Sequence, residues 1–181
     1  RPRVQGDLEK IRAAVALMAQ AKKPVFYTGG GVINSGHEAS AMLRELVRLT
    51  GFPVTSTLMG LGAYPAADPK WLGMLGMHGT YEANMAMHDC DVMICIGARF
   101  DDRITGRLNA FSPHSRKIHV DIDPSSINKN VKTEIGIVGD CGNVLRDMLA
   151  EWKAVLPKPD RAKIGAWWDE RSEEHTSELQ S

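Results

Sequence analysis

The stretch DVMICIGARF (residues 91–100) decides the fold of this chain. Its centre, Val92–Ile96, is an uninterrupted apolar run rich in β-branched residues, which predicts a buried β-strand. Gly97 ends the run, and a charged loop from Arg99 to Arg107 follows. A buried strand that ends in glycine is typical of a parallel sheet whose ligands bind beyond the strand ends.

Apolar runs on either side of this strand alternate with stretches in which apolar residues recur at the spacing of an α-helix. The runs predict strands over residues 25–28, 54–57, 118–122 and 135–138, and the spacing predicts helices over 8–18, 39–47, 81–88 and 145–156. Asp7 precedes the first helix as an N-cap. No strand or helix is predicted for residues 58–79, which are rich in Gly, Pro and Met. The alternation predicts an α/β fold with a Rossmann-like parallel sheet and helices on both faces.

The composition is typical of a globular domain in a reducing compartment. The 181 residues are 43% hydrophobic and 24% charged, with no net charge. This balance argues against nucleic acid or an anionic membrane surface as the main partner. No apolar run is long enough to span a bilayer, and we expect no secretion signal. The three cysteines have no paired spacing, so we expect a cytoplasmic protein.

The two ends of the chain qualify this composition. The first residues are Arg1-Pro2 without a Met, so we expect a longer gene product. The last eleven residues, RSEEHTSELQS (171–181), match one reading frame of a widely used sequencing adapter, and we interpret them as its translation. The alternative is a natural polar tail. Without this tail, residues 1–170 contain 21 bases and 19 acids, a net charge of +2.

Small, polar and acidic residues follow almost every predicted strand. Glycine lets backbone N–H groups approach a pyrophosphate, and acids accept hydrogen bonds from ribose hydroxyls. The sequence therefore predicts a nucleotide site at the strand ends, with a simple tight turn at the first glycines as the less favoured alternative. The segments concerned are Gly29–Gly31, Thr57 and Leu58, Gly97–Arg99, Asp121–Asp123 and Gly139–Cys141.

Other kinds of site have weaker support. The glycines before Asn34 depart from the NAD fingerprint, and no acid ends the strand over 54–57. The loop Arg99–Arg103 could bind phosphate or be a solvated loop with local ion pairs. The His and Cys residues lack zinc spacing, and no nucleophile elbow occurs, so we predict no metal ligand and no catalytic residue.

Six motifs occur together in this sequence. They are GGGVINSG (29–36), TSTLMGLGAYP (55–65), LGMHGTYEAN (75–84), GARFDDRITG (97–106), HVDIDPSSINKN (119–130) and GDCG (139–142). With these motifs in this order and spacing the chain resembles, from about residue 7 to 157, the central domain of the acetolactate synthase (acetohydroxyacid synthase) catalytic subunit. The resemblance implies a central FAD-binding domain over 1–157 and a linker over 158–170 toward a missing C-terminal domain.

The resemblance also implies an activity and its partners. The family condenses two pyruvates, or pyruvate and 2-oxobutyrate, with loss of CO₂ in branched-chain amino-acid synthesis. It uses thiamine diphosphate with Mg²⁺, bound by domains missing here, and an FAD with no net redox role. We therefore expect a parent protein that forms a homo-oligomer, dimer or tetramer, with a regulatory small subunit.

Carried over by motif, the resemblance assigns FAD contacts to the strand ends. It also places Asp102 and Arg103 near the substrate channel. The FAD contacts are Gly30, Thr57, Leu58, Leu75, Gly76, Met77, His78, Gly97, Ala98, Arg99, Phe100, Asp101, Asp121, Ile122, Asp140 and Cys141.

Some parts of the family's machinery are absent from this sequence. Cys141 follows Gly139-Asp140 where a thiamine motif would have a glycine, and the family's catalytic Glu belongs to the N-terminal domain. We therefore expect the fragment alone to be inactive. Two alternatives stay open: the central domain of another thiamine diphosphate enzyme, such as glyoxylate carboligase, and a non-catalytic nucleotide-binding module.

Overall fold

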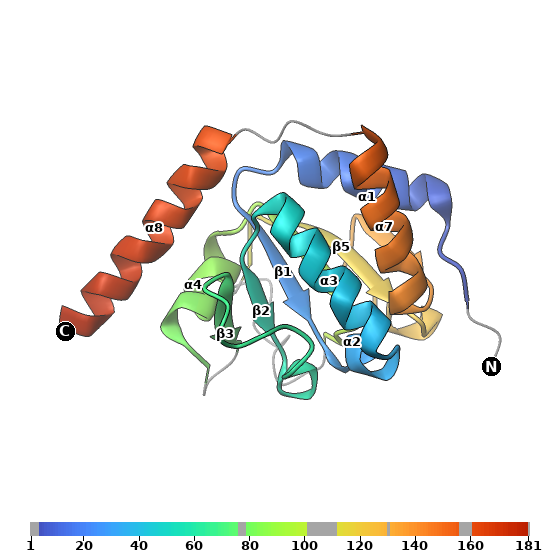
Figure 1. The fold of residues 1–181 in the computed structure, drawn as a ribbon, viewed down its shortest axis with the longest axis horizontal. Helices are drawn as coiled ribbons and strands as arrows, with labels where there is room; N and C mark the ends of the chain where they lie inside the picture. Colours follow the sequence, from blue (N-terminus) through green and yellow to red (C-terminus); the bar gives the residue numbers. More distant parts are fainter. Residues whose placement is uncertain (1–3, 76–78, 101–111, 130, 156–160, 181) are drawn as a thin grey trace.

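The computed structural model describes residues 4–75, 79–100, 112–129, 131–155 and 161–180, and within the last helix it describes the side chains of 162–171. One six-stranded, all-parallel sheet forms the centre, in the order β3-β2-β1-β4-β5-β6 (Figure 1). The α/β fold with a parallel sheet is thus confirmed. The strands are β1 Pro24–Thr28, β2 Val54–Ser56, β3 Trp71–Met74, β4 Val92–Ile96, β5 Arg116–Asp121 and β6 Ile135–Val138.

Helices cover both faces of this sheet, as the sequence predicts. On one face lie α1 (Leu8–Gln20), α3 (His37–Thr50) and α7 (Cys141–Val155), with α7 packed against both of the others (Figure 1). On the other lies α4 (Tyr81–Asp89), and α8 (Arg161–Gln180) packs against α4 while contributing Trp167 to the core on that face and Ile164 to the core on the first. Short elements complete the fold: α2 (Gly30–Asn34), η1 (Leu58–Gly60) and η2 (Pro124–Ser126).

The two faces bury two separate cores. Along β4, Ile94 and Ile96 join the core beneath α1, α3 and α7, whereas Met93 and Cys95 join the core beneath α4. All four side chains are fully buried. Successive residues of a strand point to opposite faces, so a strand that is covered on both sides is apolar throughout. This is why the run at residues 92–96 is the clearest strand signal in the sequence.

Strand β3 lies in the segment for which no strand is predicted. Its burial is only partial and it contains Gly73, whose φ of +110° few other residues adopt. It is an edge strand whose register with β2 shifts between Val54 and Thr55. A short edge strand with a glycine inside it has no apolar run from which it could be recognised.

Helix α8 begins at Arg161, within the segment expected to be a linker, and its backbone continues through the predicted adapter tail to Gln180. Two indole N–H groups attach it to the sheet domain. Trp167 is buried and donates to the carbonyl of Pro24 at 3.0 Å, and Trp168 donates to the carbonyl of Gly51 at 2.7 Å. These contacts are long-range, so sequence spacing does not reveal them. The origin of residues 171–181 stays a prediction.

None of the helices in the described part of the chain combines the length and the apolar character needed to cross a membrane.

Candidate nucleotide-binding site

Glycines bring the turns after β1 and β4 into direct backbone contact. The N–H groups of Gly29 and Gly31 donate to the carbonyls of Ile96 and Gly97, each at 3.0 Å. A Cβ at Gly29 would lie 2.5 Å from the Cα of Ala98, and one at Gly31 would lie 2.7 Å from the Cα of Gly97. Because real Cβ atoms do not approach backbone so closely, these two glycines are required by packing alone. The tight-turn interpretation therefore accounts for them.

Gly30 is different, because it faces the turn η1 that follows β2. A Cβ there would lie 3.3 Å from the Cβ of Met59, a tight contact that would require Met59 to shift by a few tenths of an ångström. The turn itself is held on the end of β1, where Thr57 N–H donates to the Thr28 carbonyl at 2.9 Å. As a result, the side chains of Leu58 and Met59 are 68% and 76% exposed. Two large apolar side chains thus stand in solvent beside Gly30, at the carboxyl edge of the sheet.

The turn after β4 alternates buried and exposed residues. Ala98 and Phe100 are buried, while Arg99 between them is exposed. The ring of Phe100 packs against Tyr27 and His119, with centroid separations of 6.2 Å and 4.9 Å. Any contact of Ala98 or Phe100 with a ligand would therefore involve backbone atoms, whereas Arg99 offers its guanidinium.

The strand-end acids are already engaged in local hydrogen bonds. Asp121 accepts from the N–H of Asp123 at 2.9 Å. Asp140 accepts from the hydroxyl of Ser35 at 2.9 Å and from the N–H of Asn143 at 3.2 Å, which caps α7. Carboxylates have several acceptor positions, so both can still bind a ribose hydroxyl.

Cys141, the first residue of α7, is buried beneath the two glycine turns. Burial raises the pKa of its thiol to about 12, with Asp121 and Asp140 adding to the shift. Its sulfur would lie 3.0 Å from a Cβ at Gly97. The side chain therefore forms the floor of the site and is a poor nucleophile.

The described site residues predicted from sequence follow all six strands at one edge of the sheet. Leu75 follows β3, Thr57 and Leu58 follow β2, and the Gly97–Phe100 turn follows β4. The most exposed side chains among them belong to Leu58, Arg99 and Ile122, the last being 56% exposed. The remaining predicted residues lie outside the described part of the chain: Gly76, Met77, His78, Asp101, Asp102 and Arg103.

Sequence reasoning missed three neighbours of this site. Met59 lies next to Leu58 in the motif TSTLMGLGAYP (55–65), so this motif already indicates it as a neighbour of the site. Ser35 binds Asp140 across 105 residues, and His119 lies in the middle of β5. Only the tertiary structure brings these two residues to the site.

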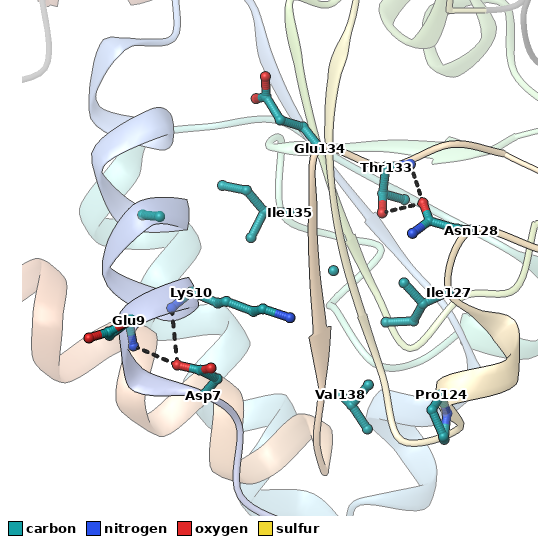
Figure 2. A pocket seen from close by; sticks show the side chains of 12 residues that line it. Asp7, Glu9, Lys10, Pro124, Ile127, Asn128, Thr133, Glu134, Ile135 and Val138 are labelled. Carbon is teal, nitrogen blue, oxygen red and sulfur yellow. Dashed lines mark hydrogen bonds between the residues drawn. The ribbon is translucent and has the colours of Figure 1, made fainter.

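A separate hollow of about 620 Å³ runs along the open edge of β6, between α1 and the turn after β5 (Figure 2). Its polar groups serve local structure: Asp7 caps α1 through the N–H groups of Glu9 and Lys10, and Asn128 accepts from Thr133. None of the predicted site residues lines it. Among the described residues, no group of three or more His, Cys, Asp or Glu side chains is arranged to hold a metal ion.

Comparison with known proteins decides the family of this domain. Residues 11–148 match the family described as the thiamine pyrophosphate enzyme, central domain. The chain belongs to this family. As a thiamine pyrophosphate enzyme central domain, it has the parallel sheet and the helices on both faces that the alternation of apolar runs and helical stretches predicts.

The relatives of this thiamine pyrophosphate enzyme central domain include much longer proteins. The chain is 46% identical over 169 residues to the acetolactate synthase large subunit of Haemophilus influenzae, and 45% identical over 169 residues to the isozyme 3 large subunit of Escherichia coli. Each alignment covers 93% of the chain and 29% of the relative. The probable acetolactate synthase large subunit of Methanocaldococcus jannaschii is 50% identical over 150 residues, which are 83% of the chain and 25% of that protein. The chain thus spans less than a third of the proteins it resembles.

Proposed function

We propose that this chain is the FAD-binding central domain of an acetolactate synthase large subunit. The observation that carries the proposal is the arrangement at the carboxyl edge of the sheet. There the exposed apolar side chains of Leu58, Met59 and Ile122 and the exposed cation Arg99 follow strands β2, β5 and β4 at one edge of the sheet. Exposed apolar side chains suit the faces of flavin and adenine rings, and a guanidinium suits a diphosphate.

The residues present fit such a dinucleotide. The two acids, Asp121 and Asp140, keep acceptor positions for ribose hydroxyls, and the main chain of Gly30 lies at the same edge of the sheet. FAD has no net redox role in this family, so the chain's residues have a binding and orienting task. Leu58, Met59 and Ile122 would exclude water from the rings while Arg99 holds the diphosphate.

The parent protein, in this proposal, condenses two pyruvates, or pyruvate and 2-oxobutyrate, with loss of CO₂. Thiamine diphosphate and Mg²⁺ are then bound by segments outside this chain. The parent is a cytoplasmic homo-oligomer, and the words "large subunit" in the names of its relatives support a small-subunit partner. The 181-residue chain alone is inactive, and acetolactate formation from pyruvate by the isolated chain would contradict this part.

The proposal can be tested in a complete enzyme. The matching segment of this chain replaces its counterpart in the Escherichia coli isozyme 3 large subunit, and the purified chimera is assayed for flavin absorbance and acetolactate formation. Bound FAD together with activity supports the proposal. A folded, colourless chimera that binds ADP in place of FAD would instead favour another thiamine diphosphate enzyme.

A matched pair of arginine variants sharpens this test. Arg99→Gln should raise the Kd for FAD about tenfold, which is typical of a lost charge-assisted hydrogen bond. Arg116→Gln should leave the Kd unchanged, because Arg116 pairs with Glu134 at the opposite end of the sheet. An equal effect of both variants would argue against a diphosphate contact at Arg99.

A further inference from the structure

His119 is a fully buried polar residue in the middle of β5. It is the register partner of Cys95 on β4, so both side chains point toward the core beneath α4 and α8. Its Nε2 lies 2.9 Å from the carbonyl oxygen of Ala98. A carbonyl can only accept, so Nε2 carries the proton and donates it to this bond.

The carbonyl that His119 binds belongs to the turn after β4. The backbone of this turn is held at three consecutive points. Gly97 N–H donates to Val120 at 2.9 Å, the Gly97 carbonyl accepts from Gly31 at 3.0 Å, and the Ala98 carbonyl accepts from His119. The next residue is Arg99, whose side chain is exposed. The direction in which Arg99 leaves the turn therefore depends on how the Ala98 peptide is oriented.

An ordinary core role does not explain the choice of histidine. A leucine or methionine would fill the space without the cost of burying an imidazole. The cost is offset by the partners of Nε2, which are the turn carbonyl of Ala98 at 2.9 Å and, at 3.7 Å, a carboxylate oxygen of Asp121. The edge of the imidazole ring also meets the Phe100 ring, with centroids 4.9 Å apart, so both buried neighbours of Arg99 contact His119.

We propose that His119 is a positioning residue for cofactor binding, which holds the Ala98 peptide so that Arg99 faces the diphosphate of the dinucleotide. His119 itself does not touch the cofactor. The inference rests on the proposed function, because it assigns to Arg99 the diphosphate contact argued above.

The test uses the chimeric enzyme and the Kd for FAD, measured by the quenching of flavin fluorescence. His119→Leu removes the imidazole donor, leaves the Ala98 carbonyl only the weak thiol donor of Cys95 at 3.4 Å, and should raise the Kd about tenfold, as Arg99→Gln does. His119→Gln keeps an N–H donor of similar reach and should restore affinity to within about threefold of the parent. His119→Phe serves as a second donor-free variant if the leucine variant does not fold.

A double-mutant cycle separates positioning from general loss of stability. If His119 acts through Arg99, the double variant His119→Leu/Arg99→Gln binds FAD no more weakly than Arg99→Gln alone. Additive losses would overturn the proposal, as would an unchanged Kd in His119→Leu or a glutamine variant no better than leucine.

Lys117→Met is the matched control. Lys117 is the other buried cation on the same face of β5, and it binds carbonyls at the opposite end of the sheet. This variant should lower the melting temperature and leave the Kd for FAD unchanged. If the parent chimera binds no FAD at all, the proposed function fails, and that result is distinct from any failure of the His119 variants.

Discussion

On the face of the sheet beneath α1, α3 and α7, strand β5 contributes Ile118 and Val120, whereas on the opposite face it contributes Lys117 and His119. All four side chains are buried. Lys117 donates to the carbonyls of Ser112 and Ser115, both at 3.2 Å, and His119 donates to that of Ala98. One face of this strand thus contributes apolar burial, and the other holds the loops at both ends of the sheet. The apolar face therefore contributes mainly to stability, whereas the face with Lys117 and His119 determines the conformation of the loops, including the turn at the candidate site.

The largest expected effect is on the apolar face. Ile94→Ala removes a fully buried side chain from the centre of β4 and should cost about 2–5 kcal/mol of stability, through lost burial and the cavity left behind. Thermal unfolding of the chimera measures the loss. The Kd for FAD of the folded variant should be unchanged, and a parallel loss of affinity would break the distinction between the faces.

A smaller effect on stability is expected from a change in pH, through His119 on the opposite face of the sheet. Burial lowers the pKa of His119, but the Cys95 sulfur, the Asp121 carboxylate and the Ala98 carbonyl outweigh it and raise the pKa to about 10. A raised pKa means that the folded state binds the proton more tightly than the unfolded state, whose histidine titrates near 6.5. This stabilisation is therefore complete below about pH 6.5 and is lost as the pH rises toward 10.

Melting temperatures measured across that pH range test the direction of this pH dependence. The parent chimera should lose more stability than His119→Gln between pH 6.5 and pH 10. Equal slopes for the two proteins would mean that His119 does not carry the titration.

Lys117→Met should cost about 1–3 kcal/mol, because the carbonyls of Ser112 and Ser115 both lose the ammonium donor and Ser112 keeps only the hydroxyl of Ser115. Relief from burying a cation reduces this cost, since burial lowers the pKa of Lys117. The melting temperature gives the result. A variant more stable than the parent would show that the cation costs more than its two hydrogen bonds return.

The smallest difference between the faces is expected for thiol chemistry. Cys90 and Cys95 lie on the face of the sheet that carries Lys117 and His119, and Cys141 lies on the opposite face, yet all three are free and buried. Burial raises the pKa of Cys90 to about 11 and that of Cys141 to about 12. In the native 181-residue chain at pH 8, Ellman's reagent should therefore react with none of the three, and with all three in denaturant. Rapid reaction of one thiol in the native chain would single out a locally open region.

The sequence predicts those strands and helices whose burial shows in the local pattern of apolar residues. Strands β1, β4 and β6 are short apolar runs, and α1 and α3 have a helical stripe, so their positions follow from periodicity alone. Strand β3 and helix α8 have no such signal. Gly73 interrupts β3, and α8 is attached by Trp167 and Trp168 to carbonyls more than a hundred residues away.

The candidate site divides in the same way. That the strand-end residues gather at one edge follows from the geometry of parallel sheets, without any side-chain detail. Which of them face solvent does not follow from the sequence. Arg99 is exposed between buried Ala98 and Phe100 because His119 and the glycine contacts hold the turn, and those contacts join segments far apart in the chain.

The contact between Gly31 and Gly97 has a consequence for the gene. Every glycine codon begins with GG, so any single-base change that alters the amino acid adds a side chain or ends translation. At Gly97, φ is +65° and a Cβ would lie 2.8 Å from the Cα of Gly31. No missense change of one base at this codon can therefore be silent in structure, and the same holds at Gly31. Gly31 and Gly97 connect the turns that follow β1 and β4, where the β1–β3 half of the sheet meets the β4–β6 half. After random mutagenesis, functional clones should therefore still encode glycine at both positions.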